Sequence, residues 1–259
     1  MPLVSVIMSV YNGDKHLEES LSSVINQSFS DWELVIVNDF SKDNSRKIIQ
    51  RAMRGDERIR CIENKNNLGL AASLNLAIQE SSGQYIARMD DDDIALPYRL
   101  EKQVAYLEVN KHVGVVGGCA ELIGEKNGMR RHAEKDIDIK NRTLFSCQFC
   151  HPTTVIRREL LEQSGIRYDE SFRTAQDYKL WVDLLPHTTF HNLSEKVLKY
   201  RVHSGQVSAI KRKEQKENTH RIYQIMLERM GLSVTDEMLH LHEAIASFSY
   251  QGQNIEEVS

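Results

Sequence analysis

The sequence has few cysteines and no excess of basic residues, and each shortage excludes a class of protein. Four cysteines in 259 residues cannot build the dense disulfide framework of small secreted domains, which favours a reduced, cytoplasmic protein. The formal net charge is −4, whereas nucleic-acid-binding proteins normally carry a clear basic excess. We therefore expect no nucleic-acid partner.

Long apolar runs are also missing. The N-terminus, Met-Pro-Leu-Val-Ser-Val, has neither the basic start nor the apolar core of a signal peptide, and no stretch approaches the apolar length of a membrane span. The hydrophobic share of 41% and the charged share of 27% are ordinary for a globular protein. A chain of this length predicts one large domain or two small ones.

Glycine-rich phosphate-binding loops are the third absence. The first apolar run, Val4–Val10, is followed by Tyr-Asn-Gly rather than by G-x-G-x-x-G, and the chain contains no G-x-x-x-x-G-K-[ST]. Dinucleotide and P-loop sites hold phosphates through the backbone of such loops. Any phosphate bound by this chain must therefore be held by a metal ion and by side chains.

Apolar runs alternate with segments of helical periodicity in the first hundred residues. Runs rich in β-branched residues predict buried strands at residues 4–10, 32–37, 59–62 and 84–89. The segments between them predict helices that begin near Asp14 and Ser41, with these two side chains as N-caps, and a third helix over Leu70–Glu80. This order implies an α/β fold with a doubly wound, mostly parallel sheet.

Four consecutive acids, Asp90 to Asp93, follow the fourth predicted strand. Sheets of this class bind ligands at the carboxyl ends of their strands. Like charges so close cannot all stay ionised in a partly dry site without a cation, and oxygen donors suit Mg²⁺ or Mn²⁺. A solvated acidic loop is the alternative. An EF-hand is excluded because Ile94 and Ala95 occupy loop positions five and six.

The topology brings three loops to one edge of the sheet, at residues 9–12, 38–41 and 90–93. A nucleotide can lie across them, with Asp39 accepting a base N–H, Tyr11 contacting the base or ribose, and the metal bridging the phosphates. That arrangement favours a chemistry in which a metal stabilises a diphosphate.

At this point the sequence resembles a known family, the family 2 glycosyltransferases of the GT-A fold, of the bacterial polysaccharide and lipopolysaccharide type. The matching segments follow one another in order along the chain, which is far more specific than any one motif. They are residues 4–13, 33–41, 67–75, 85–94, 151–157, 176–181 and 200–208. The resemblance implies a nucleotide-sugar-binding half over residues 1–110, an acceptor-binding half of the same GT-A domain over 111–210, and a C-terminal helical extension over 211–259.

The resemblance implies an inverting, metal-dependent hexosyltransferase that uses a UDP-sugar and Mn²⁺ or Mg²⁺. Asp39 would bind uracil, Asp92 would be the chief metal ligand, and Asp90 would serve both ribose and metal. His203 would join the metal or diphosphate site; the alternative is a surface histidine. The implied donor-binding residues are Val10, Tyr11, Asn12, Asp39, Asn67, Asp90 and Asp91.

Two departures from the family pattern affect the implied site. Asn38 stands where members usually carry the first of two acids, and Gln176 replaces the first acid of the Glu-Asp pair near the catalytic base. The base assignment therefore rests on Asp177 alone. A carboxylate sheltered by aromatic residues can have a raised pKa suited to general-base work, while a helix cap is the alternative for Asp177. The implied acceptor-binding residues are His151, Gln176 and Trp181.

The resemblance suggests transfer of glucose, galactose or an N-acetylhexosamine to a saccharide, a lipid-linked O-antigen or capsule repeat unit. From Lys211 onward, basic residues accompany a helical apolar pattern. We interpret this segment as part of a helical pair that covers the core. The functional alternative is peripheral contact with the inner face of the cell membrane.

Two functions of other classes stay open from the sequence. One is a catalytically silent nucleotide-sugar-binding protein. The other is a haem or metal carrier, because Cys147, Cys150 and His151 form the C-x-x-C-H pattern of c-type haem attachment. Haem attachment of that kind needs export, and a zinc site lacks a second ligand pair. Both arguments disfavour the carrier.

Overall fold

The computed structural model describes residues 1–206 and 210–255. Its strands are β1 (Val4–Val10), β2 (Trp32–Asn38), β3 (Ile59–Glu63), β4 (Tyr85–Arg88), β5 (Ile94–Ala95), β6 (Val113–Gly124), β7 (Gly128–Arg130), β8 (Val155–Arg157) and β9 (Thr189–Val202). Its helices are α1 (Leu17–Ile25), α2 (Ser45–Gly55), α3 (Leu70–Glu80), α4 (Arg99–Val109), α5 (Asp136–Thr143), η1 (His151–Thr153, 3₁₀), α6 (Arg158–Ser164), α7 (Gln176–Leu184), α9 (Arg212–Arg229) and α10 (Asp236–Ile255). Residues 207–208, which end the last matching segment, lie outside the described residues.

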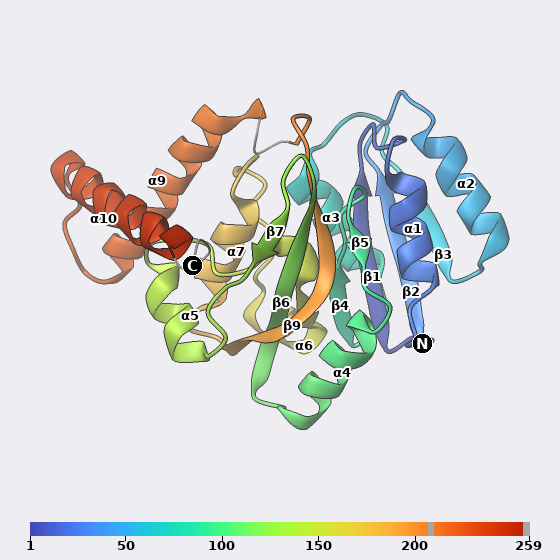
Figure 1. The fold of residues 1–259 in the computed structure, drawn as a ribbon, viewed down its shortest axis with the longest axis horizontal. Coiled ribbons are helices and arrows are strands. Elements are labelled where there is room, and N and C mark those ends of the chain that lie inside the picture. Colours follow the sequence, from blue (N-terminus) through green and yellow to red (C-terminus); the bar gives the residue numbers. More distant parts are fainter. Residues whose placement is uncertain (207–209, 256–259) are drawn as a thin grey trace.

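The strands form a mixed sheet in the order β3-β2-β1-β4-β8-β6-β9-β5, with β7 paired to β6 (Figure 1). The first four strands are parallel, because β1 pairs with β2 and β4 while β2 pairs with β3. This confirms the parallel sheet predicted from the alternating segments. Antiparallel β8 then connects β4 to β6.

The part of the chain from residue 113 onward contributes longer strands than the first half. The two longest strands of the sheet, β6 and β9, lie there and pair in parallel, with register shifts that accompany their curvature (Figure 1). The first eight residues of β6 are buried, and β9 contributes the buried apolar residues Phe190, Leu193, Val197 and Leu198. The curled pair leads back to the acid loop, since β9 also pairs with β5.

The hydrophobic core occupies both faces of the sheet. In β1, Val6 and Met8 pack with α1, α2 and α4 on one face, whereas Ile7 packs with α3 and α7 on the other. A strand buried on both faces needs a near-continuous apolar run, which is what its sequence has. The doubly wound arrangement is confirmed.

The predicted caps Asp14 and Ser41 are wrong. The N-cap residues are His16 for α1 and Asn44 for α2. Asp14 Oδ2 instead accepts the N–H of Asn44 at 3.2 Å, and Ser41 Oγ accepts the N–H of Asn12 at 3.0 Å. Both side chains join the β1–α1 loop to the β2–α2 loop. They therefore stabilise the carboxyl edge of the sheet and do not cap a helix.

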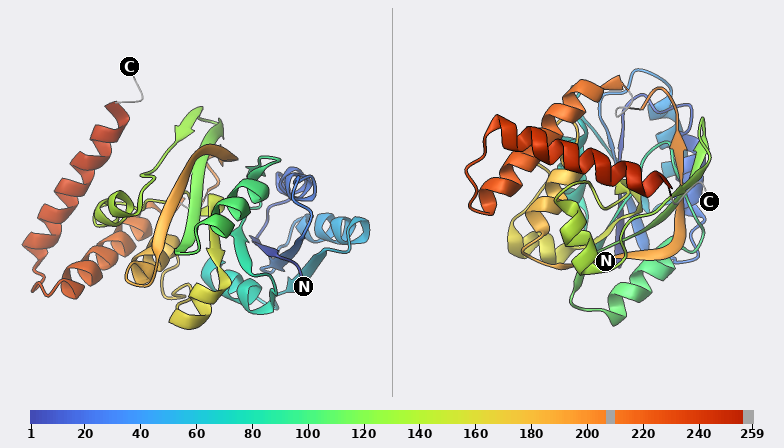
Figure 2. Two further views of the ribbon diagram at one scale, coloured as in Figure 1. Left: turned by 90° about the horizontal axis from the view of Figure 1, so that it is seen from below. Right: turned by 60° about the vertical axis from the view of Figure 1, so that its left-hand side comes forward.

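The C-terminal helices α9 and α10 pack at the end of the molecule opposite β3 (Figure 2). Ile222 and Met226 of α9 are buried with Tyr178 and Val182 of α7, which confirms the predicted pair that covers the core. Several cations of α9 are paired, including Lys216 with Glu243 at 2.7 Å and Arg229 with Asp183 at 2.7 Å. Within residues 1–206 and 210–255, every helix is too short or too polar to cross a membrane.

Substitution of Gly83 tests how closely the chain packs against β1. A Cβ added there would lie 2.5 Å from the backbone nitrogen of Ser5 and 2.7 Å from Ser5 Oγ, inside the paired strand. We expect Gly83→Ala to lower the free energy of unfolding by about 1–3 kcal/mol. Gly55→Ala is the matched control, because nothing lies within 4 Å of its added Cβ. Urea unfolding compares the two variants, and equal stability would contradict this packing.

Candidate active site

Three acids converge where the chain leaves β4. Carboxylate oxygens of Asp90, Asp92 and Asp93 lie within 4.8 Å of one another. Asp93 is 0% exposed; its Oδ1 accepts the N–H of Arg201 at 2.7 Å, and its Oδ2 has no hydrogen-bond partner among the described residues. A buried, unpartnered carboxylate oxygen beside two other carboxylates is the donor set of a hard divalent cation. The residues present therefore fit Mn²⁺ or Mg²⁺.

Asp93 was missing from the predicted ligand set of Asp90, Asp92 and His203. The sequence did contain the relevant feature, the fourth acid of the run, but a D-x-D pattern passes over it. The structure does bring His203 to the cluster, since its Nε2 lies 2.9 Å from Asp92 Oδ2. This histidine follows β9, which β5 ties to the acid loop.

Burial and electrostatic repulsion together disfavour the ionised acids of this cluster. Burial, followed by the charges of Asp92 and Asp90, raises the pKa of Asp91 to about 8. Burial and Asp90 raise the pKa of Asp92, against the opposing effect of His203. The pKa of Asp93 is raised well above its ordinary range, again chiefly by burial. Each of these shifts disfavours the ionised acid, which is the condition that a bound cation relieves.

Arg88 is a second residue that sequence reasoning missed. Its guanidinium is 2% exposed and donates through Nη2 to Asp90 Oδ1, forming an ion pair. Nε and Nη1 have no hydrogen-bond partner within the described part of the chain. An arginine inside an apolar strand is unusual, and this placement was the signal in the sequence that could have identified Arg88 as a functional residue. Its charge opposes the burial-driven rise in the pKa of Asp91 and of Asp177.

Asp39 lies at the carboxyl end of β2 and is 2% exposed. Its Oδ1 accepts Asn64 Nδ2 and the N–H of Leu68, both at 2.8 Å, and its Oδ2 accepts the N–H of Gly69 at 2.9 Å. Asn67 Nδ2 lies 3.4 Å from the Asp39 carbonyl oxygen. The carboxylate is therefore held rigidly by the β3–α3 loop, and Oδ2 keeps a free acceptor position.

The β1–α1 loop adds the other predicted donor-side residues. Val10 is buried, whereas Tyr11 is exposed at the sheet edge. Asn12 has a φ of 54° and Phe40 a φ of 66°, a left-handed conformation that residues with a Cβ rarely adopt. Asn12 Oδ1 accepts the N–H of Lys42 at 2.8 Å, which links the two strained loops. Such strain concentrates where a fold fixes a ligand site.

Asp177 lies in the first turn of α7. Burial raises its pKa, and the N–H groups of Tyr178 and of Asp177 itself, followed by the charge of Arg88, oppose that rise. Cys147 Sγ lies 3.9 Å from Asp177 Oδ2. The residue before the helix, Ala175, has a φ of 56° and a ψ of 20°. The carboxylate thus belongs to a sheltered, conformationally strained helix start.

The predicted acceptor-side residues gather behind Asp177. Gln176 is buried, and His151 Nε2 lies 2.7 Å from the hydroxyl of Tyr168. The Trp181 ring is 1% exposed, with its centroid 5.1 Å from that of Phe149 and 6.2 Å from that of His151. Trp181 therefore packs beneath His151, and a direct contact between Trp181 and an acceptor stays a prediction.

The C-x-x-C-H segment does not suit a haem. Cys150 is buried, Cys147 points to Asp177, and His151 already contacts Tyr168. Burial also raises the pKa of Cys150 to about 12, so the thiol stays protonated and unreactive. Covalent attachment needs both thiols accessible, which this packing prevents.

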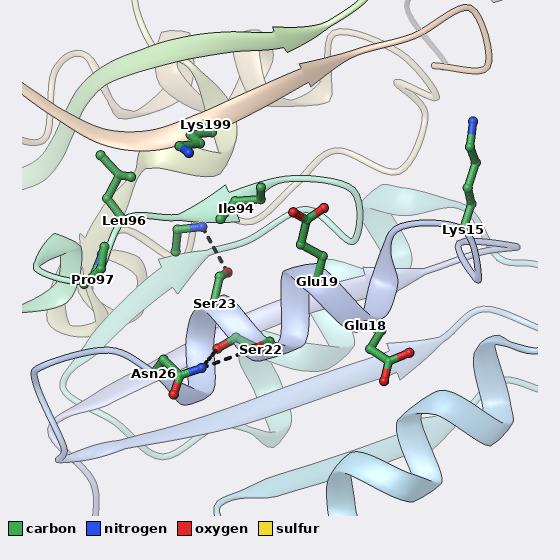
Figure 3. Close-up of a pocket in the computed structure, with 11 residues that line it drawn as sticks. Lys15, Glu18, Glu19, Ser22, Ser23, Asn26, Ile94, Leu96, Pro97 and Lys199 are labelled. Carbon is green, nitrogen blue, oxygen red and sulfur yellow. Dashed lines mark hydrogen bonds between the residues drawn. The ribbon is translucent and has the colours of Figure 1, made fainter.

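A surface groove of ≈ 640 Å³ lies on the outer side of α1, next to β5 and Lys199 (Figure 3). Exposed polar side chains such as Glu18, Ser22 and Asn26 line it. Ser23 Oγ accepts the N–H of Ala95 at 3.0 Å along its floor. The predicted site residues do not line it, so the groove is separate from the acid cluster.

Comparisons with known proteins identify the family of this chain. Residues 5–165 match the model of the family described as glycosyl transferase family 2. An uncharacterised glycosyltransferase of Haemophilus influenzae is 35% identical over 85% of this chain and 72% of its own length. The O-antigen biosynthesis glycosyltransferase WbnJ of Escherichia coli is 35% identical over 81% of this chain and 84% of its own length. The chain belongs to glycosyltransferase family 2.

Similarity to solved structures identifies the fold. TarS 1–349 of S. aureus, in complex with UDP-GlcNAc, matches 95% of this chain and 73% of its own with a TM-score of 0.73 and 18% identity. The mannosyltransferase PcManGT of Pyrobaculum calidifontis, with GDP-Man and Mn²⁺, matches 98% of this chain and 75% of its own with a TM-score of 0.68 and 17% identity. The fold is GT-A, as the resemblance implied.

Replacement of Asp93 should change stability in opposite directions with and without metal. The raised pKa of Asp93 means that the folded state loses stability as pH rises through that pKa. Asp93→Asn should therefore unfold at a higher temperature than the unchanged protein in EDTA at pH 8. With Mn²⁺ at 100 times its Kd, the unchanged protein should gain about 2.7 kcal/mol that the variant lacks.

Thermal unfolding in EDTA and in Mn²⁺ measures both effects. Asp31→Asn, at an exposed position on the opposite edge of the sheet, is the control and should respond to Mn²⁺ as the unchanged protein does. An equal Mn²⁺ response of Asp93→Asn would remove Asp93 from the ligand set.

Proposed function

We propose that this chain transfers a sugar from a UDP-sugar to a saccharide acceptor with inversion at the anomeric carbon, in a metal-dependent reaction. The observation that carries the proposal is the acid cluster Asp90, Asp92 and Asp93, with a sheltered carboxylate, Asp177, within reach of its charges. Inversion needs a leaving group stabilised on one side of the sugar and a base on the other. Membership of family 2 and a structural neighbour in complex with UDP-GlcNAc support this choice.

In the proposed site, the donor residues hold the nucleotide. Asp39 accepts the uracil N–H through its free acceptor position on Oδ2, with Val10, Tyr11, Asn12 and Asn67 around the base and ribose. Asp90 and Asp91 face the ribose and diphosphate. A divalent cation held by Asp90, Asp92, Asp93 and His203, either Mn²⁺ or Mg²⁺, supplies positive charge for the diphosphate leaving group.

Asp177 acts as the general base. It takes the proton of the acceptor hydroxyl, whose oxygen forms the new bond to the anomeric carbon as the bond from that carbon to the diphosphate breaks. The electron pair of the broken bond leaves with UDP. Burial suits the carboxylate to this role because it raises the proton affinity above that of a free aspartate.

In this proposal, His151, Gln176 and Trp181 form the acceptor-binding side of the site. We propose that residues 1–110 bind the donor, residues 111–210 the acceptor, and residues 211–259 form a helical extension. The acceptor we propose is a lipid-linked polysaccharide repeat unit, in keeping with a relative that acts in O-antigen biosynthesis. Peripheral membrane contact would then bring the protein to its acceptor.

A donor screen tests the proposed function. The purified protein with Mn²⁺ is incubated with UDP-glucose, UDP-galactose, UDP-GlcNAc or GDP-mannose and with total lipid-linked oligosaccharide, and release of UDP or GDP is followed. We expect release from one UDP-sugar. Release from GDP-mannose alone would replace the UDP assignment, and absence of transfer from all four donors would contradict the function.

Asp177→Asn separates a glycosyltransferase from a silent binding protein. The variant should keep UDP affinity and lose about 10²–10⁴-fold in kcat, because a positioned general base contributes that much. Asp31→Asn, at an exposed position just before β2, is the control and should keep most of the activity. Near-normal turnover by Asp177→Asn would show that the base is elsewhere.

The pH profile of the unchanged protein gives a second test of the base. Because burial raises the pKa of Asp177, the carboxylate becomes active only above that raised value. The kcat should therefore fall on the acid side with a midpoint above the ordinary aspartate pKa of 3.8. A midpoint at or below that value would contradict a buried base.

A further inference from the structure

Asn218 of α9 contacts the segment that leads into α7. Its side chain is buried, and its Nδ2 donates to the carbonyl oxygen of Thr174 at 3.2 Å and to Thr174 Oγ1 at 2.9 Å. Its Oδ1 accepts Arg221 Nη1 at 2.9 Å. An asparagine in the middle of a helix usually points to solvent, so this buried contact needs an explanation.

The contact lies three residues before the proposed base. Thr174 is followed by Ala175, which adopts the left-handed conformation, and then by Gln176 and Asp177. A residue with a Cβ holds that conformation only where its surroundings fix it. Asn218 fixes the carbonyl and the hydroxyl of Thr174, the residue directly before the strained one. The strained turn sets the direction in which α7 starts, and so the direction of the Asp177 carboxylate.

The same helix also holds the other chain segment beside Asp177. Tyr223 donates its hydroxyl to the carbonyl oxygen of Phe145 at 2.7 Å, two residues before Cys147. Tyr178, next to Asp177, donates to the carbonyl oxygen of Thr143 at 2.5 Å. Side chains of α9 thus contact both chain segments that lie beside Asp177, and α9 lies next to α7 in Figure 1.

We propose that the C-terminal extension is part of the active site, and that Asn218 is a positioning residue that sets the orientation of Asp177. The inference rests on the proposed role of Asp177 as the base. Asp177 and Asn218 both lie beyond residue 165, where the match to the family model ends. The positioning device therefore belongs to the part of this chain that the family model does not describe.

Hydrogen exchange of the backbone amides tests the structural half of the proposal. Two variants remove the Nδ2 donor: Asn218→Leu, and Asn218→Asp, which keeps the shape of the side chain. Amides of residues 172–178 should exchange about tenfold faster in both, as expected for loss of one to two buried hydrogen bonds. Gln224→Ala, on the exposed side of α9, is the control and should leave these amides unchanged. Unchanged exchange in both Asn218 variants would overturn the proposal.

Steady-state kinetics test the functional half. We expect the Asn218 variants to lose about tenfold or more in kcat with an unchanged donor KM, because the base is misplaced and the donor site is intact. Val104→Ala in α4 provides a protein destabilised by lost core packing far from Asp177, and its kcat should be retained. Faster exchange with an unchanged kcat would overturn the positioning role.

Failure of the proposed function is distinguishable from these outcomes. If Asp177→Asn is as active as the unchanged protein, the base assignment fails, and with it the positioning of a base by Asn218. If Asp177→Asn is inactive while both Asn218 variants keep their kcat, the proposed function stands and only the present inference fails.

Discussion

Repulsion among the carboxylates after β4 is the constraint on which the rest of the structure depends. Asp90, Asp92 and Asp93 stand together at the edge of the sheet, and Asp93 is fully buried. Placing several like charges in a poorly solvated site is costly unless positive charge compensates them. The surrounding fold supplies part of that compensation through the Arg88 ion pair, the N–H of Arg201 and the ring of His203.

The residues that compensate the acid cluster come from both halves of the chain. Arg88 comes from the parallel half, whereas Arg201 and His203 come from β9 and the turn after it, more than a hundred residues later. The long curved pair β6–β9 carries them back across the sheet, and β9 pairs with β5 beside the acids. Without that curved pair, Asp93 would lack the N–H of Arg201 and Asp92 would lack His203, so the second half of the chain completes the acid site.

Much of the first half was predictable from sequence. The order of strands and helices along the chain and the bounds of α3 follow from apolar periodicity, because a strand buried on both faces and an amphipathic helix leave unmistakable patterns. The caps were not predictable. Asp14 and Ser41 have cap-forming side chains, yet each bonds across to a neighbouring loop, and a local pattern cannot reveal a partner about thirty residues away.

The candidate site divides in the same way. The run of four acids predicted where the metal site lies. The assignment of Asp93 as a metal ligand depends on its burial and on an N–H from β9, which only the folded chain reveals. Asn218 escaped notice for the same reason, since it acts through a contact with a segment 44 residues away. Arg88 pairs with Asp90 only two residues on, and it is the burial of its guanidinium that the folded chain reveals. The length of β9 could not be predicted from the sequence, because its middle residues are exposed and interrupt the apolar pattern.

Calorimetric titration of UDP into the protein, first with Mn²⁺ and then with EDTA, tests most directly the claim that the acid cluster is a diphosphate–cation site. Our account predicts binding in Mn²⁺ that EDTA abolishes. Equal binding in both conditions would leave a nucleotide site but remove the acid cluster from it. Absence of binding in both would contradict the account as a whole.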